Sequence, residues 1–414
     1  TTTHVTYIDA AIAANGQADN NNFYQTWWRA AIQNDDQLRQ RVAFAYSQIF
    51  VISLNDPNVD VRGVASYYDM LNRNAFGNFR TLLEDVTLHP MMGRYLTFLA
   101  NQKEDAAGTR TPDENYAREV MQLMTVGLVE LNVDGTPRLN GSGQQIPSYT
   151  AADIAGLAKV FTGISWFHPT PTNNTFFGNN ADANRNITPM IFYPNFHSTS
   201  EKVFLGTTIP AGSTVDVAGD LRIALDRLFN HPTTGPFVSQ RLIQQFVTSN
   251  PSPAYVGRVA AVFANNGAGV RGDMAAVVRA VLTDAEARNM TAVSSVDFGK
   301  LREPVIRVTN WARAFGATSQ TGNYLITSTS ANTSLNQSPM SSPSVFNFWR
   351  PGFTPPATTQ LGQRSLVAPE FQVIDEVTAA AYINVMQDWI NNGIGSTPPG
   401  GAGRDVRTSY TAEL

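Results

Sequence analysis

The chain contains no cysteine among its 414 residues, which excludes disulfide bonds, thiolate metal sites and a cysteine nucleophile. Charged residues make up only 15%, below the roughly 25% of ordinary globular proteins. The net charge of −4 gives no basic field that would attract nucleic acid or anionic lipid. No apolar run reaches the length of about 18 residues that a membrane helix needs. We therefore predict no nucleic-acid partner and no membrane span.

Common catalytic motifs are also missing. The five histidines include no HExxH pair, and no G-x-S-x-G nucleophile motif occurs. Asp134 and Gly135 form a turn signal, but the residues around them lack the alternating acidic positions of an EF-hand. These absences argue against a zincin protease, an α/β-hydrolase and an EF-hand protein.

Residues 111–128 carry the clearest helix-start pattern in the chain. Thr111 is a good N-cap, Pro112 suits the first helical position, and Glu114 follows the cap by three residues. The pattern predicts a capping box and a helix. Its apolar face would contain Tyr116, Val120, Leu123, Met124 and Leu128.

Polar residues of the same stretch allow two interpretations. Asn115 and Glu119 lie four residues apart on one stripe, and Arg118 stands four residues after Glu114. Such a face is usually solvated and holds internal ion pairs. The alternative is that Asn115 and Glu119 point into a pocket.

Helical periodicity predominates along the rest of the chain. We predict a mainly α fold, a multi-helix globular domain with long polar loop excursions and minor β hairpins. Residues 1–300 would form a helical core domain with excursions at 131–148 and 163–212. Residues 301–390 would complete the same domain, with a polar excursion at 318–347, and residues 391–414 would form a flexible tail.

Several stretches together resemble the DUF1800 family of bacterial proteins. The central one is DENYAREVMQLMTVGL, followed by Tyr149, Asp153 and AGLAKVFTG at 155–163. Further blocks lie at residues 38–53, 88–96, 231–247 and 368–378. No single block is decisive, but their joint order is specific. The resemblance implies an exported protein with no settled activity, located in the periplasm, at the cell surface or outside the cell.

The chain departs from the family pattern at two places. In one branch of the family a histidine-bearing motif ends the helix that spans residues 38–53, where this chain has Ser47 and Gln48. A metal role inferred from that branch does not carry over. The family's His-Asp-x-x-x-Lys motif corresponds to His197 and Lys202, but Ser198 replaces the aspartate. If that aspartate were a base or ligand, its loss would weaken any catalytic role.

The candidate site residues form a non-contiguous set. Candidates for catalysis are Glu119, His89, His197 and Lys202, and candidates for binding are Asn115, Arg118, Asp153 and Trp166. Glu119 and His89 are also the candidate metal ligands, because carboxylates and imidazoles hold divalent cations. The sequence identifies no cofactor, although a divalent cation is compatible with this set.

Two function hypotheses remain, and whether the protein is an enzyme stays open. The favoured one is a non-catalytic surface or assembly protein of the bacterial envelope that binds neighbouring chains or glycans through its loops. The alternative is an exported, metal-assisted enzyme that acts on an envelope or polymeric substrate. An enzyme should place His89, Glu119 and His197 around one open pocket, whereas a structural protein should bury them in satisfied pairs.

Overall fold

The computed structural model of the chain describes residues 3–289 and 294–411. The predicted fold class is confirmed, because the protein is 46% helical and its sheets are short. Within the described residues each sheet has only two antiparallel strands. No helix in these ranges combines the length and apolarity that crossing a membrane requires.

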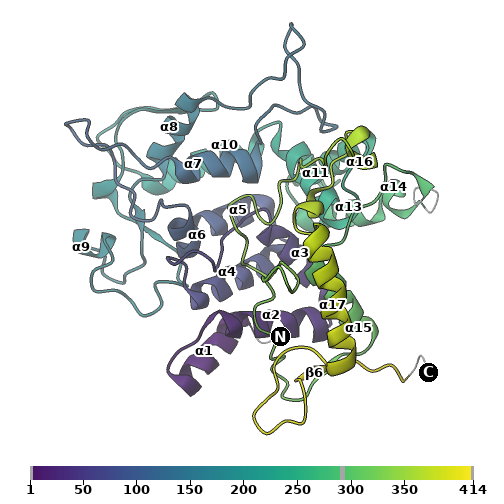
Figure 1. The fold of residues 1–414 in the computed structure, drawn as a ribbon. Coiled ribbons are helices and arrows are strands. Elements are labelled where there is room, and N and C mark those ends of the chain that lie inside the picture. Colours follow the sequence, from purple (N-terminus) through teal and green to yellow (C-terminus); the bar gives the residue numbers. More distant parts are fainter. Residues whose placement is uncertain (1–2, 290–293, 412–414) are drawn as a thin grey trace. The chain divides into compact units, whose positions relative to one another are not determined.

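The chain divides into two compact units, Thr1–Asn72 with Gly299–Leu414 as unit 1 and Arg73–Phe298 as unit 2. Unit 1 is thus built from both ends of the chain. Its elements, drawn in purple and in green to yellow in Figure 1, are α1 (His4–Asn15), α2 (Asn20–Gln33), α3 (Gln37–Ser47), α4 (Val61–Arg73), α15 (Pro304–Ala314), β5 (Thr318–Ser319), α16 (Gln360–Gln363), η5 (Pro369–Gln372), α17 (Glu376–Asn392) and β6 (Val406–Arg407).

Unit 2 contains the predicted site residues. Its elements are η1 (Asn74–Phe76), α5 (Phe79–Leu88), α6 (Pro90–Tyr95), α7 (Asn115–Glu119), η2 (Val120–Thr125), α8 (Ala151–Val160), β1 (Ile164–Ser165), α9 (Asn173–Phe176), β2 (Ile191–Phe192), η3 (Pro194–Phe196), β3 (Lys202–Phe204), β4 (Thr207–Ile209), α10 (Val217–Asn230), α11 (Thr234–Phe246), α12 (Pro253–Ala264), α13 (Met274–Thr283) and α14 (Ala285–Arg288).

Helix α2 provides the aromatic core of unit 1. A capping box between Asp19 and Asn22 starts the helix, and its side chains Phe23, Trp27 and Trp28 are buried. The indole Nε1 of Trp27 donates to the hydroxyl of Tyr68 over 2.9 Å, whereas the buried Nε1 of Trp28 has no hydrogen-bond partner among the described residues.

The end of the chain is also structured in unit 1. Strand β6 pairs with β5, and Val406 is buried within the segment for which a tail is expected. The carboxylate of Asp405 accepts hydrogen bonds from Ser319 Oγ at 2.7 Å and from the backbone N–H of Leu325 at 2.9 Å. These contacts tie the chain end to the segment after α15.

The predicted capping box at Thr111 is wrong. Helix α7 begins at Asn115, and its N-cap residue, Glu114, makes no side-chain cap. The reason is a competing contact, because Asn101 Oδ1 accepts from the backbone N–H of Asp113 at 2.9 Å and holds the preceding segment outside the helix. Asp113 itself caps Asn115 N at 2.8 Å. After Glu119 the helix widens into the π-helical element η2.

Three aromatic rings anchor α7 in unit 2. The ring of Tyr116 stacks on Phe98 with centroids 4.2 Å apart and meets Phe161 edge-on at 4.8 Å. Its buried hydroxyl is 2.7 Å from Thr87 Oγ1, which satisfies the phenol. Most of the apolar face predicted for this stretch therefore faces the core, because Tyr116, Val120 and Met124 are fully buried and Leu123 is half-buried. The prediction is wrong for Leu128, which follows the end of η2 and keeps 61% of its surface.

Helix α8 and strand β3 approach each other unusually closely. A Cβ on Gly156 would lie 1.8 Å from the carbonyl oxygen of Val203, so only glycine fits at this position. Asp153 in the first turn of α8 accepts from the backbone N–H of Leu205 at 2.7 Å. The same contact fixes β3, which carries Lys202.

Residues 128–148 form a hydrogen-bonded excursion from unit 2. The backbone N–H groups of Arg138, Ile146 and Glu130 donate to the carbonyls of Glu130, Arg138 and Ile146, at 2.7, 3.1 and 2.8 Å. The three positions are eight residues apart and close a ring. Residues 137–145 beyond it are all exposed, and Leu139 keeps 57% of its accessible surface.

Candidate functional site

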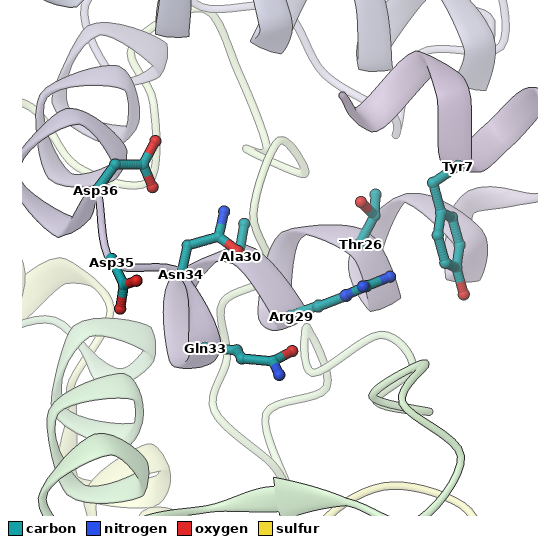
Figure 2. Close-up of a pocket in the computed structure, with 8 residues that line it drawn as sticks. All are labelled: Tyr7, Thr26, Arg29, Ala30, Gln33, Asn34, Asp35 and Asp36. Carbon is teal, nitrogen blue, oxygen red and sulfur yellow. The ribbon is translucent and has the colours of Figure 1, made fainter. Parts of the chain in front are cut away.

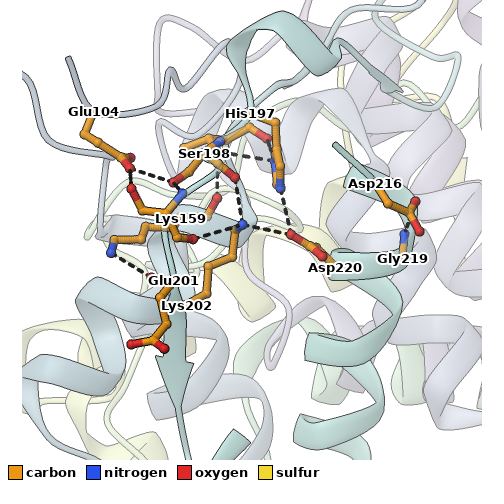
Figure 3. A network of polar contacts seen from close by, with 11 residues as sticks. Glu104, Lys159, His197, Ser198, Glu201, Lys202, Asp216, Gly219 and Asp220 are labelled. Carbon is orange, nitrogen blue, oxygen red and sulfur yellow. Dashed lines mark hydrogen bonds and ion pairs between the residues drawn. The ribbon is translucent and has the colours of Figure 1, made fainter. Parts of the chain in front are cut away.

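His197, Lys202 and Asp220 meet inside unit 2 (Figure 3). Asp220 on α10 faces His197 Nε2 at 3.0 Å and Lys202 Nζ at 2.9 Å through one carboxylate oxygen. The other ring nitrogen of His197 is 2.7 Å from the carbonyl oxygen of Thr162. Both ring nitrogens thus face oxygen atoms, one of a carboxylate and one of a backbone carbonyl.

The neighbours of this trio extend the network. Lys202 Nζ donates to the carbonyl oxygen of Ser198 at 2.7 Å, and Ser198 Oγ donates to Glu104 Oε1 at 2.8 Å. Burial opposes ionisation of Glu104, but hydrogen bonds from Ser200 and Ser198 outweigh it and lower the pKa of this carboxyl. The network therefore contains two carboxylates, Asp220 beside the buried Lys202 and Glu104 beside two serine hydroxyls.

Little of this network reaches solvent. His197 has no accessible surface, Lys202 keeps 3%, and the side chain of Asp220 keeps 14%. Their polar atoms bond to one another or to backbone carbonyls. Such an arrangement positions a loop, a strand and a helix relative to one another.

Sequence reasoning did not identify Asp220, although its contacts with His197 and Lys202 are those expected of a site residue. The aspartate expected after His197 is replaced by Ser198, yet a carboxylate does reach both His197 and Lys202. It comes from a different helix, 23 residues further along the chain. The residue spacing around Asp220 gives no sign of this role, so the contact could be identified only from the three-dimensional structure.

His89 acts as a helix cap between α5 and α6. Its side chain accepts a hydrogen bond from the backbone N–H of Met91 through Nδ1 at 3.2 Å. The residue keeps only 4% of its surface, and burial, assisted by the charge of Arg73, lowers its pKa to about 3. The neutral ring at ordinary pH suits a cap, which agrees with the structural interpretation of a histidine before proline.

Glu119 is the one predicted site residue with an unsatisfied buried atom. It keeps 7% of its surface, and Oε2 has no hydrogen-bond partner among the described residues. Burial raises its pKa, while Arg118 opposes the shift. Tyr149 lies near enough for the Glu119 charge to raise the pKa of its phenol as well, although burial contributes more.

The remaining binding candidates have local structural partners. Asn115 Nδ2 donates to Thr97 Oγ1 at 3.3 Å, and Arg118 pairs with Glu114 at 3.2 Å on an exposed face. Asp153 caps α8 through its contacts with Thr150. An exposed pair such as Arg118 with Glu114 contributes about 0.5 kcal/mol or less.

Trp166 is buried rather than presented to solvent. It keeps 6% of its surface and is flanked by two guanidinium groups, from Arg94 at 4.7 Å and Arg185 at 4.9 Å. Its backbone carbonyl accepts from the hydroxyl of Tyr193 at 2.8 Å. The ring therefore fixes the long loop between β1 and β2 and offers no free face for stacking on a sugar.

The structure unites only part of the predicted set. His197 and Lys202 share Asp220, whereas His89 and Glu119 each have separate neighbours. Within residues 3–289 and 294–411, no three His, Cys, Asp or Glu side chains are grouped so that they could hold a metal ion. The proposed metal pair of Glu119 and His89 thus lacks a third such ligand in that part of the chain.

A second buried polar cluster lies in unit 1, and sequence reasoning missed it too. Glu303 Oε2 accepts from Gln48 Nε2 at 2.6 Å and from Gln337 Nε2 at 2.5 Å. Nearby, Lys300 pairs with Glu370 at 2.8 Å, and each of these two side chains keeps 3% of its surface. Gln48 and Glu370 come from two of the blocks by which the chain resembles the family.

Burial dominates the electrostatics of this second cluster. It raises the pKa of Glu303, and the charge of Lys300 and the two glutamine amides oppose the shift. Gln48 Oε1 and Glu370 Oε2 have no partner within the described chain. The cluster joins α15 to the ends of α3 and η5, and the only sequence signal was Pro304, which marks the helix start after Glu303.

Residues 267–272 match the glycine spacing G-x-G-x-x-G, but they do not form a dinucleotide site. The stretch connects α12 to α13, whereas the nucleotide motif requires a strand before its glycine turn. Its last glycine, Gly272, lies instead against the ring of Phe229.

One protein-family model, described as "Protein of unknown function (DUF1800)", matches residues 3–402. The match covers nearly all of the chain and includes both polar clusters. No curated protein matches this chain, and no solved structure matches it either.

Proposed function

Since the chain belongs to the DUF1800 family, whose description names no activity, we propose from the site itself that this protein is a non-catalytic surface or assembly protein of the bacterial envelope. It is exported and binds neighbouring chains or glycans through its loops. The main support for the proposal is the buried network of His197, Lys202 and Asp220. The polar groups of these residues bond to other groups of the protein.

The exposed excursion at 128–148 supports a binding role. Residues 137–145 are uniformly exposed and rich in amide and hydroxyl groups, and Leu139 adds an apolar contact point. The ring of backbone hydrogen bonds at Glu130, Arg138 and Ile146 holds this tip in shape. A preorganised loop loses less conformational entropy when it binds a partner.

The first experiment measures metal content by mass spectrometry on the purified native protein and on Glu119→Ala. We expect no stoichiometric metal in either sample. A stoichiometric metal that is lost in the variant would contradict the proposal and support the alternative, an exported metal-assisted enzyme acting on an envelope or polymeric substrate. The unsatisfied Oε2 of Glu119 is the observation that favours this alternative.

The second experiment tests the loop itself. Leu139→Ser should weaken retention of the protein by isolated bacterial envelopes, measured by co-sedimentation, and should reduce self-association measured by light scattering. Val270→Ser is the matched control, because it changes an exposed apolar residue in a different loop of the same unit. If Leu139→Ser behaves like the wild type in both measurements, binding through this excursion is wrong.

A further inference from the structure

A polar pocket of about 440 Å³ opens in unit 1, apart from every residue of the predicted site (Figure 2). Its size falls within the range of about 300–1,000 Å³ typical of small-molecule sites. The pocket is formed by α1, α2 and the connection from α2 to α3. Its lining residues are Tyr7, Thr26, Arg29, Ala30, Gln33, Asn34, Asp35 and Asp36.

Arg29 is the residue that points to a ligand. Its guanidinium is half-buried, and no described residue accepts a hydrogen bond from it or forms an ion pair with it. Burial raises the pKa values of the Tyr7 and Tyr324 phenols. The charge of Arg29 opposes this rise, whereas the charge of Asp405 adds to it. Asp405 is occupied, however, because it accepts from Ser319, from the N–H of Thr321 and from the N–H of Leu325.

A guanidinium presents five donors in a planar fork that matches a carboxylate with two parallel hydrogen bonds. In the pocket this fork lies beside the ring of Tyr7 (Figure 2). The hydroxyl of Tyr7 donates to Gln25 at 3.0 Å and keeps its acceptor capacity. A single carboxylate would therefore find both charge and geometry on this side of the pocket.

The other side of the pocket offers mixed donors and acceptors. The side chains of Gln33, Asn34 and Asp35 make no hydrogen bond or ion pair with other described residues, and Figure 2 shows them along the far part of the pocket. Amides donate and accept, whereas carboxylates only accept. Hydroxyl groups complement such a set, because each one can donate and accept at once. Asp35 and Asp36 would repel a multiply charged anion.

We propose that this pocket binds a carboxylate-bearing sugar, such as a uronic acid unit of a glycan. Arg29 holds the carboxylate, and Gln33, Asn34 and Asp35 bond to the ring hydroxyls. The inference rests on the binding role proposed above and names its ligand class. It can fail separately, because the envelope experiment changes Leu139 in unit 2 whereas the pocket belongs to unit 1.

The test is titration calorimetry of the full chain with glucuronate, glucose and inorganic phosphate. We expect glucuronate to bind at least about tenfold more tightly than glucose, and phosphate to bind no better than glucose. Arg29→Met should remove the preference for glucuronate. Arg288→Met is the matched control, since it removes an equal charge from an exposed position outside the pocket, and it should bind like the wild type.

A second variant keeps the proposal testable if Arg29→Met does not fold. Gln33 is exposed, so Gln33→Glu should leave the circular dichroism spectrum and melting temperature unchanged. The added negative charge should nevertheless weaken glucuronate binding about tenfold. Equal affinity for glucose and glucuronate, tighter binding of phosphate, no binding of either sugar, or an Arg29→Met variant that binds normally would each overturn the proposal.

Discussion

At the residue scale, substitution of Glu119 is the best test of whether α7 has a structural or a catalytic role. Its Oε2 is buried without a partner among the described residues, and its raised pKa indicates that the fold disfavours the charged carboxylate. A buried donor or acceptor left unsatisfied costs about 1–3 kcal/mol, and more when the group is charged. A structural protein tolerates this cost as a defect, whereas an enzyme or metal protein uses it.

We predict that Glu119→Gln stabilises the protein at pH 7 by about 1 kcal/mol, because the amide carries no charge to desolvate. The folded pKa of Glu119 lies above its ordinary value of 4.5, so its contribution to stability is complete below pH 4.5 and is lost as pH rises through the folded pKa. The gap between variant and wild type should therefore open above pH 4.5.

Chemical denaturation at a series of pH values measures this gap, and Glu114→Gln on the exposed end of the same helix is the control. A variant that is less stable than the wild type at pH 7 would show that the Glu119 carboxylate has a favourable partner. If that loss appears only when divalent cations are present, the partner is a metal ion.

At the element scale, Asp220 joins α10 to the loop and strand that carry His197 and Lys202. Asp220→Asn leaves the buried ammonium of Lys202 without its counter-charge and removes a carboxylate oxygen that faces His197. Removing one partner of a buried pair typically costs about 3–5 kcal/mol. We expect a loss of about 3 kcal/mol in the free energy of unfolding, measured by urea denaturation.

The control for this prediction is Asp226→Asn on the same helix. Asp226 pairs with Arg80, but its side chain is 45% exposed, so the expected loss is below about 1 kcal/mol. Equal losses for the two variants would mean that the internal network contributes no more than a surface ion pair.

Gly156→Ala tests the contact between α8 and β3. The added Cβ would overlap the carbonyl oxygen of Val203, which is backbone and cannot rotate away. We predict a loss of about 3 kcal/mol, at the upper end for overpacking, detected as a lower melting temperature. Gly141→Ala should be nearly neutral, because no atom lies within 4 Å of its added Cβ. A harmless Gly156→Ala would show that this close approach is absent in solution.

The same elements show what sequence reasoning can reach. Apolar periodicity predicts the helices and the buried face of Tyr116, Val120 and Met124, because one helix buries one stripe. It fails at Thr111, where Asn101 competes for the backbone from outside the local window. It also misses Asp220, Glu303 and Glu370, whose partners come from distant segments. Long-range polar contacts leave no periodic signal in a single sequence.

At the scale of the whole molecule, the division into two units is itself testable. Residues 73–298 form a continuous stretch with its own aromatic core and its own polar network. Domains with a complete core fold alone. We predict that the fragment 73–298 is helical by circular dichroism and unfolds cooperatively in urea.

A fragment that remains unfolded would show that unit 2 depends on the rest of the chain. The complementary fragment, residues 1–72 alone, should be unfolded, because it lacks partners from the far end of the chain, where α15 packs against α2. Among these partners is Glu303, which accepts from Gln48.

Building unit 1 from both ends of the chain has a consequence during synthesis. The aromatic side chains of α2 leave the ribosome early, but α15 and α17 follow only after more than two hundred residues of unit 2. At about 5–20 residues per second, α2 waits on the order of tens of seconds for α15, against which it packs in the finished unit. During that interval the nascent chain carries an incomplete hydrophobic surface. A chaperone that shields residues 20–47 until translation ends should therefore raise the yield of folded protein.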